Sequence, residues 1–210
     1  MYNVPYFKEQ DQKILLDFIE EYPLAFITGI DADGKPVATQ IPILVVKRDG
    51  DLYLQGHMMR NADHHKAFKE NPQVLAVFTG PNCYVSASWY TDPHGGSTWN
   101  YMSVHVQGEI QFLPEAQLKS LMQDFTLKHE KENTKSPTVF NNLPESYHAK
   151  MLPAIEGFEL KIDQLKNVFK LSQNRDEASY TNIIKELEAQ GGYAEMVAKE
   201  MKKRKDKLFT

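Results

Sequence analysis

The sequence predicts a mainly β protein with peripheral helices, of the α+β class, in which about six antiparallel strands form a small, closed or partly closed barrel. The first observation is a series of short apolar runs between residues 24 and 112, joined mostly by turns that contain glycine and aspartate. The second is a change after Pro114, where amphipathic helical spacing takes over. The length of 210 residues suits one large domain or a domain with an appendage.

The first half of the chain holds most of the expected strands. Residues 9–22 have helical spacing that ends at Pro23, and residues 24–30 follow as a first strand. A second strand over residues 37–47 should bend at Pro42, because proline cannot donate a hydrogen bond to a neighbouring strand. The later elements are a strand over 51–56, a helix from near Arg60 to residue 70, and strands over 74–79, 83–89 and 99–112.

The second half of the chain is expected to be mainly helical. The pattern predicts helices over residues 115–131 and 144–152, and an alternating strand over 157–165. A helix over residues 181–189 should end at Gly191-Gly192, and a charged helix follows from residue 193. We therefore expect a β-rich domain over residues 1–175 and a helical C-terminal extension over residues 176–210.

Composition excludes several classes of function. The net charge of −4 gives no global field that would attract nucleic acid. The one cysteine, Cys83, excludes an intrachain disulfide and a Cys-rich metal site, and lies in an apolar run where we expect a packed thiol. No apolar run approaches the ~18 residues that a membrane span needs, and the N-terminus lacks a signal-peptide profile. No membrane partner and a cytoplasmic location are therefore expected.

Residues 78–112 are rich in aromatic side chains and contain both tryptophans of the chain, Trp89 and Trp99. Composition alone favours a hairpin whose aromatic residues fill a β core. The alternative is a wall against a flat, partly polar ligand, because tryptophan is rigid and carries one N–H donor. The sequence leaves both open.

Residues 57–72 form a possible anion site. The first turn of a helix has free N–H groups and the positive end of the helix dipole, and Arg60 could add a bidentate contact, with His57 as a further donor. An ordinary solvated helix start is the equal alternative. His64 and His65 are adjacent and cannot chelate one metal together, and His105 is isolated on a strand, so no metal site is expected. The motifs of nucleotide-binding loops and serine hydrolases are absent.

The C-terminal region offers the main electrostatic feature that could contact nucleic acid. Six cations lie within residues 199–207 and could contact phosphates. The stronger alternative is a solvated helix end, where cations favour the negative end of the dipole. No aromatic residue is interleaved to stack on bases, so the support for DNA binding is weak.

Five segments together resemble one family, the PaiB-type FMN-binding proteins, which are described as negative transcriptional regulators. The matching segments are Val4-Pro5-Tyr6-Phe7, GHMMRNADHH, FTGPNCYVSASWY, STWNYMSVHVQGEI and KLSQN. The chain departs from the family pattern after His57, where RNADHHKAF replaces the more usual RANPxW.

The resemblance implies the FMN-binding split β-barrel, which is shared with pyridoxamine-phosphate oxidases, and a homodimer with FMN at the subunit interface. By motif it assigns the phosphate to His57, Met58, Arg60 and Asn61. It places Thr39, Gln40 and Ile41 along the flavin ring. Further contacts are expected from Trp99, Asn100, Lys170 and Gln173.

Three functions follow as hypotheses. The first is an FMN-binding flavoprotein of the PaiB type, which could be an oxidoreductase like the pyridoxamine-phosphate oxidases, although no residue is marked as a general acid or base. The second is a regulator that acts on DNA. The third is haem binding, for which the candidate axial ligands are His57, His64, His65 and His105.

Overall fold

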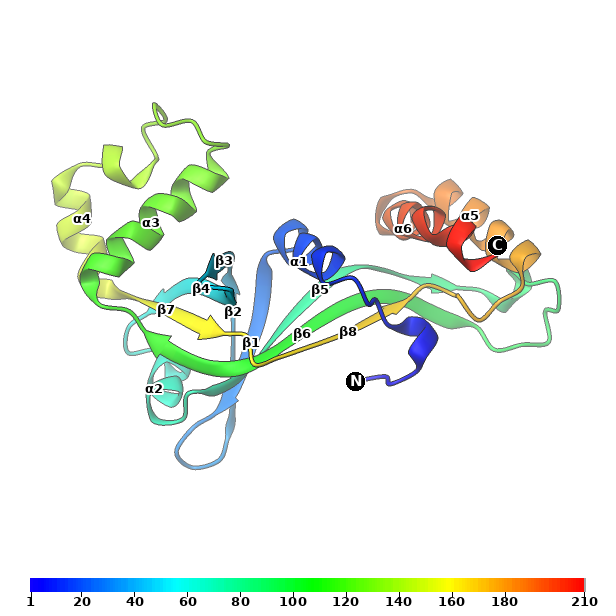
Figure 1. Cartoon of the computed structure of the whole chain (residues 1–210), viewed down its shortest axis with the longest axis horizontal. Helices are drawn as coiled ribbons and strands as arrows, with labels where there is room; N and C mark the ends of the chain where they lie inside the picture. The colour runs from blue at the N-terminus through cyan, green and yellow to red at the C-terminus, as the bar shows by residue number, and fades with distance from the viewer. Residues whose placement is uncertain (210) are drawn as a thin grey trace. The chain divides into compact units, whose positions relative to one another are not determined.

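The computed structural model describes residues 1–209 and is built on an eight-stranded sheet with the strand order β2-β1-β5-β6-β7-β4-β3, in which β8 pairs with β6 (Figure 1). The strands are β1 (Leu24–Ile30), β2 (Pro36–Pro42), β3 (Leu44–Arg48), β4 (Asp51–Met59), β5 (Gln73–Val85), β6 (Thr98–Phe112), β7 (Ile155–Lys161) and β8 (Gln164–Lys170). The pairings β1–β2, β1–β5, β3–β4, β4–β7 and β6–β7 are antiparallel. The order ends at β2 and β3, so the sheet is not a closed ring, and the mainly β prediction is confirmed.

Among the described residues, six α-helices accompany the sheet: α1 (Gln12–Glu21), α2 (Asp63–Glu70), α3 (Glu115–His129), α4 (Glu145–Met151), α5 (Glu177–Gln190) and α6 (Gly192–Leu208). The chain divides into two compact units. One contains residues 1–18, 79–104 and those from 166 onward, and the other contains residues 19–78 and 105–165. The expected boundary after residue 175 stays a prediction, and Thr210, the last residue of the expected extension, lies outside the described residues.

Several expected bounds were wrong. The strand over residues 37–47 is two strands, because the Ile43 N–H donates to the carbonyl oxygen of Pro23 (2.9 Å) and the Ile43 side chain is buried between them. Residues 73–85 form one strand instead of two, and residues 87–89 are a 3-10 helix. The single strand over 157–165 is replaced by β7 and β8, with a turn at residues 162–163.

The bounds near the expected anion site also differ. β4 continues to Met59, so His57 and Met58 are strand residues, and α2 begins at Asp63 instead of near Arg60. The cause is local: Asn61 has a φ of 64°, which lies in the left-handed region and interrupts helical geometry between β4 and α2.

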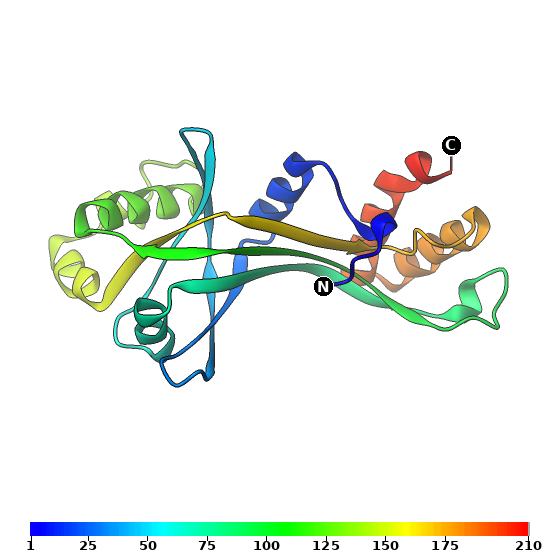
Figure 2. The same ribbon diagram turned by 60° about the horizontal axis from the view of Figure 1, so that its bottom comes forward.

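In the unit formed by residues 19–78 and 105–165, α3 packs on β7. A Cβ added at Gly157 would lie 3.2 Å from the Leu118 Cδ1 atom and 3.4 Å from the Leu121 Cδ2 atom, so only glycine allows this approach without movement. Leu118 also packs with Met122, Phe140 and Ile155 in a buried cluster. This packing positions α3 and α4 beside the start of β7 (Figures 1 and 2).

The other unit is held by α5 and α6. The Asp176 carboxylate caps α5 by accepting a hydrogen bond from the Ser179 N–H (2.9 Å), and Gly191, with a φ of 69°, ends the helix. The buried Tyr180 hydroxyl donates to the carbonyl oxygen of Met201 on α6 (3.0 Å). These contacts make the two helices one packed pair.

A shared carboxylate joins the β4–α2 turn to β7. Glu156 at the start of β7 has a side chain that is only 11% exposed. Its Oε2 atom accepts a hydrogen bond from His65 Nε2 (2.5 Å) and forms ion pairs with Arg60 Nη1 (2.9 Å) and Lys69 Nζ (3.0 Å). The Asn61 N–H donates to His65 Nδ1 (3.2 Å), so in its neutral form His65 carries its proton on Nε2 and donates it to Glu156.

These contacts stabilise the ionised carboxylate. Burial acts to raise the pKa of the Glu156 carboxyl, but hydrogen bonds from His65 and Lys69 and the charges of Arg60 and Lys69 outweigh it, so the pKa is lowered. A buried carboxylate without such partners would be strongly destabilising. Glu156 therefore fixes the position of Arg60 and of the left-handed turn at Asn61.

We predict that Glu156→Gln lowers the free energy of unfolding by about 3 kcal/mol at pH 7, because it removes the charge that three donors share. The folded-state pKa is lowered, so this stabilisation is present above the ordinary value of 4.5 and is lost as the pH falls through the folded-state value. Urea denaturation of wild type and variant at pH 7 and at pH 3 should show the difference shrinking in acid.

Glu115→Gln is the matched control, because Glu115 is paired with Lys119 (2.9 Å) at an exposed position on α3. It should change the stability by no more than about 0.5 kcal/mol. Equal losses for the two variants, or a loss at Glu156 that does not depend on pH, would contradict a stabilising role of the shared carboxylate.

Candidate functional site

The sequence-predicted site residues fall into two groups, one in each compact unit. Thr39, Gln40 and Ile41 on β2, His57 and Met58 on β4, and Arg60 and Asn61 in the following turn belong to the unit of residues 19–78 and 105–165. Trp99, Asn100, Lys170 and Gln173 belong to the other unit.

Of the three predicted residues on β2, only Gln40 is exposed. Gln40 pairs with Phe26 on β1, and both side chains are exposed. Ile41 is buried, and its Cγ2 atom would lie 3.1 Å from a Cβ added at Gly56 on β4. Thr39 pairs with the buried Ile27 and is half-buried. Of the three, Gln40 is best placed to contact a bound molecule from this face.

An apolar row continues from Phe26 along β1. Leu24, Phe26 and Ile30 are exposed, while the alternate residues Ala25 and Ile27 are fully buried. Phe26 also pairs with Val77 on β5, which is half-buried. One face of the β2–β1–β5 segment therefore exposes large apolar side chains, which proteins normally cover.

His57 and Met58 are held inside their unit. Met58 is buried, and His57 lies opposite Gly157 in the β4–β7 pairing with its ring edge toward Phe125 (5.9 Å between ring centroids). Burial lowers the pKa of His57, which favours its neutral form. Its Nδ1 atom is buried and, among the described residues, has no hydrogen-bond partner.

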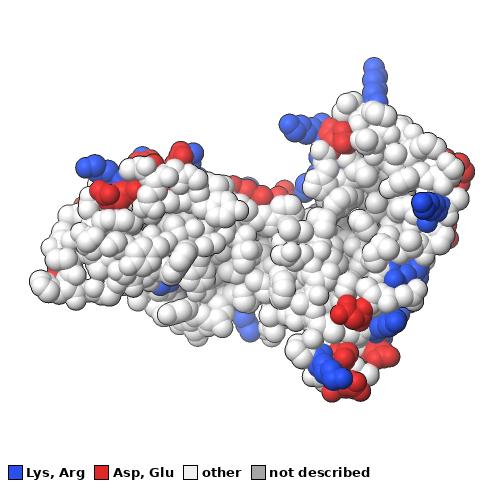
Figure 3. All heavy atoms as spheres, turned by 180° about the vertical axis from the view of Figure 1, so that it is seen from behind, with Lys and Arg blue, Asp and Glu red and all other residues white. Residues whose placement is uncertain are grey.

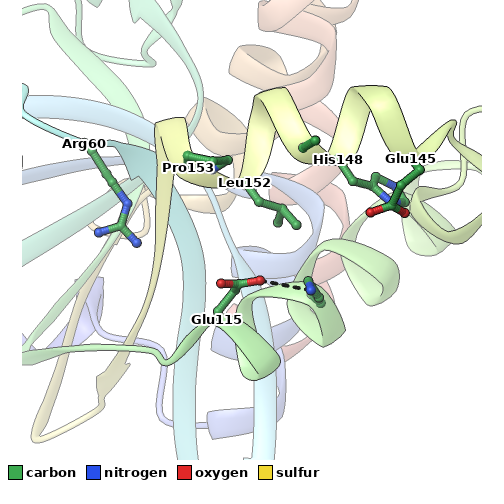
Figure 4. Close-up of a pocket in the computed structure, with 8 residues that line it drawn as sticks. Arg60, Glu115, Glu145, His148, Leu152 and Pro153 are labelled. Carbon is green, nitrogen blue, oxygen red and sulfur yellow. Dashed lines mark ion pairs between the residues drawn. The ribbon is translucent and has the colours of Figure 1, made fainter.

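Arg60 lines a cavity of about 320 Å³ together with Glu115, Lys119, Glu145, His148, Ala149, Leu152 and Pro153. Its Nε atom donates to the carbonyl oxygen of Ile155 (2.9 Å) and its Nη1 atom forms an ion pair with Glu156, so one edge of the guanidinium is fixed. In Figure 4 Arg60 and Glu115 point toward the same space, and Glu115 pairs with Lys119. A bound anion would meet two cations here, and also two exposed carboxylates.

In the other unit the structure brings together the two segments that the resemblance assigned to the site. Lys170 Nζ donates to the Thr98 hydroxyl, and the Ser172 hydroxyl donates to Asn100 Oδ1 (3.0 Å). Residues 98–100 of β6 and 170–173 therefore lie side by side. Burial, and then the charge of Arg175, lower the pKa of Lys170.

Two residues of this group have structural partners. Asn100 is fully buried, and its Nδ2 atom contacts the Met201 sulfur (3.5 Å). Gln173 Oε1 accepts from the Leu171 N–H (2.7 Å), and its Nε2 atom donates to the carbonyl oxygen of Phe169. These contacts shape the loop after β8, whereas Trp99 and Lys170 retain exposed atoms.

The aromatic hairpin is partly core and partly surface. Tyr90 is buried, which fits the core alternative, while Trp99 is 53% exposed and meets the exposed Tyr84 edge to face (6.4 Å between centroids). The exposed aromatic pair fits the wall alternative. The sequence analysis did not identify Glu156, because no local pattern marks it as a partner of Arg60.

The histidines proposed for haem have other partners in several cases. Both ring nitrogens of His65 are engaged, and His64 Nδ1 lies 3.0 Å from Asp63. Within residues 1–209 no group of three or more His, Cys, Asp or Glu side chains is arranged to hold a metal ion. No helix in this part of the chain is long and apolar enough to cross a membrane.

Most C-terminal cations are paired with carboxylates. The pairs are Lys199–Glu195, Lys202–Glu188, Lys203–Glu200, Arg204–Glu200 and Lys205–Glu177. On the face seen in Figure 3, acidic and basic side chains are interspersed over several regions. Paired cations release few counterions on binding DNA, so α6 should contribute little to the affinity for DNA.

Comparison with known proteins gives concordant results. Residues 1–164 match the family model described as "Putative FMN-binding domain". The chain is 31% identical to protease synthase and sporulation protein PAI 2 of Bacillus subtilis (strain 168) over 188 residues, which cover 90% of this chain and 89% of that protein.

Solved structures with the same fold include the flavocytochrome Anf3 from Azotobacter vinelandii, with a TM-score of 0.57 and 19% identity over 80% of this chain and 72% of that one. The FAD and heme binding protein from Mycobacterium smegmatis gives a TM-score of 0.55 and 20% identity over 77% of this chain and 72% of that one. These likenesses confirm the split-barrel fold. The chain accordingly belongs to the PaiB-type family of FMN-binding proteins.

Proposed function

We propose that this chain is a flavoprotein that binds FMN between two copies of itself. The observation that carries the proposal is the exposed face of β2, β1 and β5, where the polar Gln40 lies directly opposite the exposed Phe26. The same face thus offers an amide that can hydrogen-bond the polar edge of a flavin and an apolar row that needs a cover. A second copy would cover the apolar row and enclose a flavin bound beside Gln40.

The proposed contacts divide by chemistry. In one unit, Gln40 supplies an amide suited to the heteroatoms of the ring. In the other unit, Lys170 supplies a cation suited to a polar ring edge, and Trp99 supplies an exposed aromatic wall. Thr39 and Ile41 shape the strand that carries Gln40, and His57, Met58 and Asn61 shape the approach to Arg60. Asn100 and Gln173 hold the loop that follows Lys170. When bound, FMN would supply electron-transfer chemistry, and the protein would orient the ring and limit its exposure to water.

Arg60 is the proposed phosphate ligand. Glu156 and the Ile155 carbonyl hold one edge of its guanidinium, which reduces the side-chain entropy that a ligand contact would cost. The cavity beside it also contains Lys119. A phosphate there would gain charge-assisted hydrogen bonds, whereas riboflavin, which has the ring and ribityl chain without the phosphate, would not.

The negative-regulator role implied by the family resemblance stays a prediction. Because most cations of α6 are paired with carboxylates, we infer that any regulatory role works without a DNA contact made by this helix. Haem binding also stays a prediction, since the flavin- and haem-binding neighbours share the fold alone.

We predict that the purified protein binds FMN more tightly than riboflavin, and that Arg60→Gln removes most of this difference. The loss in FMN affinity should be tenfold to a hundredfold, because a hydrogen bond to a charged group contributes about 1.5–3 kcal/mol. Titrations followed by flavin absorbance and fluorescence would measure both affinities. Lys66→Gln on α2, which removes an equal charge from an exposed position, is the control and should leave both affinities unchanged.

Two results would count against this assignment. The first is a wild-type protein that ignores added FMN. The second is an Arg60→Gln variant that matches Lys66→Gln, which would leave FMN binding intact but remove Arg60 from the phosphate site. Unchanged riboflavin affinity shows that the Arg60 variant is folded.

We also predict that Phe26→Asp separates the dimer. The buried area of one Phe side chain is worth about 2 kcal/mol, and a symmetric dimer loses two of them, so the dimer dissociation constant should rise roughly a thousandfold. Light scattering coupled to size exclusion over a dilution series would measure this constant. Tyr147→Asp, at an exposed apolar position on α4, is the matched control. A wild-type monomer, or equal effects of the two changes, would refute an interface on this face.

A further inference from the structure

The N-terminal segment, residues 1–8, is tied down by a specific set of polar contacts. Lys8 Nζ donates to the carbonyl oxygens of Tyr2 (2.7 Å) and Asn167 (2.8 Å), and so joins the start of the chain to β8. The next residue, Glu9, exchanges two hydrogen bonds with Asn167: its N–H donates to Oδ1 (2.8 Å) and its carbonyl oxygen accepts from Nδ2 (2.9 Å). The dark-blue segment lies beside β8 in both views (Figures 1 and 2).

Burial of the Phe7 side chain explains only part of how residues 1–8 are held. The side chain anchors the segment to the core of its unit. Residues upstream of such an anchor usually remain loose at a chain terminus. Here Lys8 bonds back to Tyr2, six residues away, and fixes the backbone of a residue whose side chain fills no core, since Tyr2 is 54% exposed.

The contact with Lys8 places the Tyr2 ring at the proposed flavin site. Lys170 Nζ lies 5.9 Å from the centre of the ring. Burial and the nearby Tyr2 raise the pKa of Tyr101, which places the two phenols close together. Tyr101 lies two residues after the exposed Trp99 and therefore on the same face of β6. Tyr2 thus extends an aromatic surface that already includes Trp99 and Tyr84.

The chemistry of this group suits a flat heteroaromatic ring. The aromatic side chains offer apolar faces, and Lys170 offers a cation whose hydration is already reduced by burial. A ligand that places a polar ring edge near Lys170 would replace the lost hydration, and its face could pack on tyrosine. An isoalloxazine ring has both features.

We propose that Tyr2 is a ligand-contacting residue of the flavin site, and that residues 1–8 form an N-terminal strap that carries it there. This inference rests on the proposed FMN binding and adds a residue to that site. Because Tyr2 would touch the ring and not the phosphate, it should contribute equally to the binding of FMN and of riboflavin. This behaviour separates its role from that of Arg60.

Tyr6 provides a matched comparison within the same strap. It is the same residue type, it is 52% exposed, and its ring meets the anchor Phe7 (4.5 Å between centroids). It has no contact with Lys170 or Tyr101 in the structure over residues 1–209. If exposure near the N-terminus were the only feature that matters, Tyr2 and Tyr6 would behave alike.

The experiment compares Tyr2→Ala, Tyr2→Phe and Tyr6→Ala in the full-length protein by titration with FMN and riboflavin. We expect Tyr2→Ala to weaken both ligands by about tenfold, as for loss of an aromatic contact. Tyr2→Phe should retain the affinity of the wild type within about twofold, because the ring is kept. Tyr6→Ala should have no effect, and the oligomeric state of each variant should be measured at the concentration of the titration.

The outcomes are distinguishable. Equal affinities for Tyr2→Ala and Tyr6→Ala would overturn the inference, as would a Tyr2→Ala variant that loses dimer while the remaining dimer binds flavin normally. The second result would mean that a partner subunit, and not the flavin, covers Tyr2. Failure of the wild-type protein to bind FMN or riboflavin would instead refute the proposed function, and the inference with it. An effect on FMN alone would also exclude a ring contact.

Discussion

The arrangement of the β4–α2 turn depends on one carboxylate. Glu156 pairs with Arg60, His65 and Lys69, which come from the turn after β4 and from two turns of α2. Through the Asn61 N–H, His65 also supports the left-handed residue that separates strand from helix. A buried charge is favourable only with such partners, so the position of Arg60 is set by β7 as much as by its own strand.

The exposed side chains of the two units are the basis of the proposed function. In one unit, the apolar row of β1 lies beside Gln40, and in the other, Trp99, Tyr84 and Tyr2 remain in contact with water. Large exposed apolar side chains are usually covered by a partner or a ligand. We propose FMN and a second copy as the covering groups, and both would explain why polar and aromatic side chains occur together at these positions.

Local pattern predicted the mainly β class and nearly every helix, because apolar periodicity and Gly, Asp and Pro turns are local signals. The sequence predicted a bend at Pro42 but not the separation of two strands at Ile43, where the backbone N–H bonds to the distant Pro23. Gly80-Pro81 falls between two strands that the sequence predicted, but it lies inside β5. The turn before β8 was not predicted, because its residues, Ile162-Asp163, include no glycine. Glu156 looked like an ordinary acidic residue before a strand, because its three donors meet it only in the folded chain.

Native mass spectrometry of the purified protein, incubated with FMN and desalted before measurement, can establish whether two copies of the chain enclose FMN. We expect a species whose mass equals two chains plus two FMN molecules, and we expect bound flavin to be lost when the dimer is dissociated. A single chain that retains one FMN, or a dimer that retains none, would contradict this expectation.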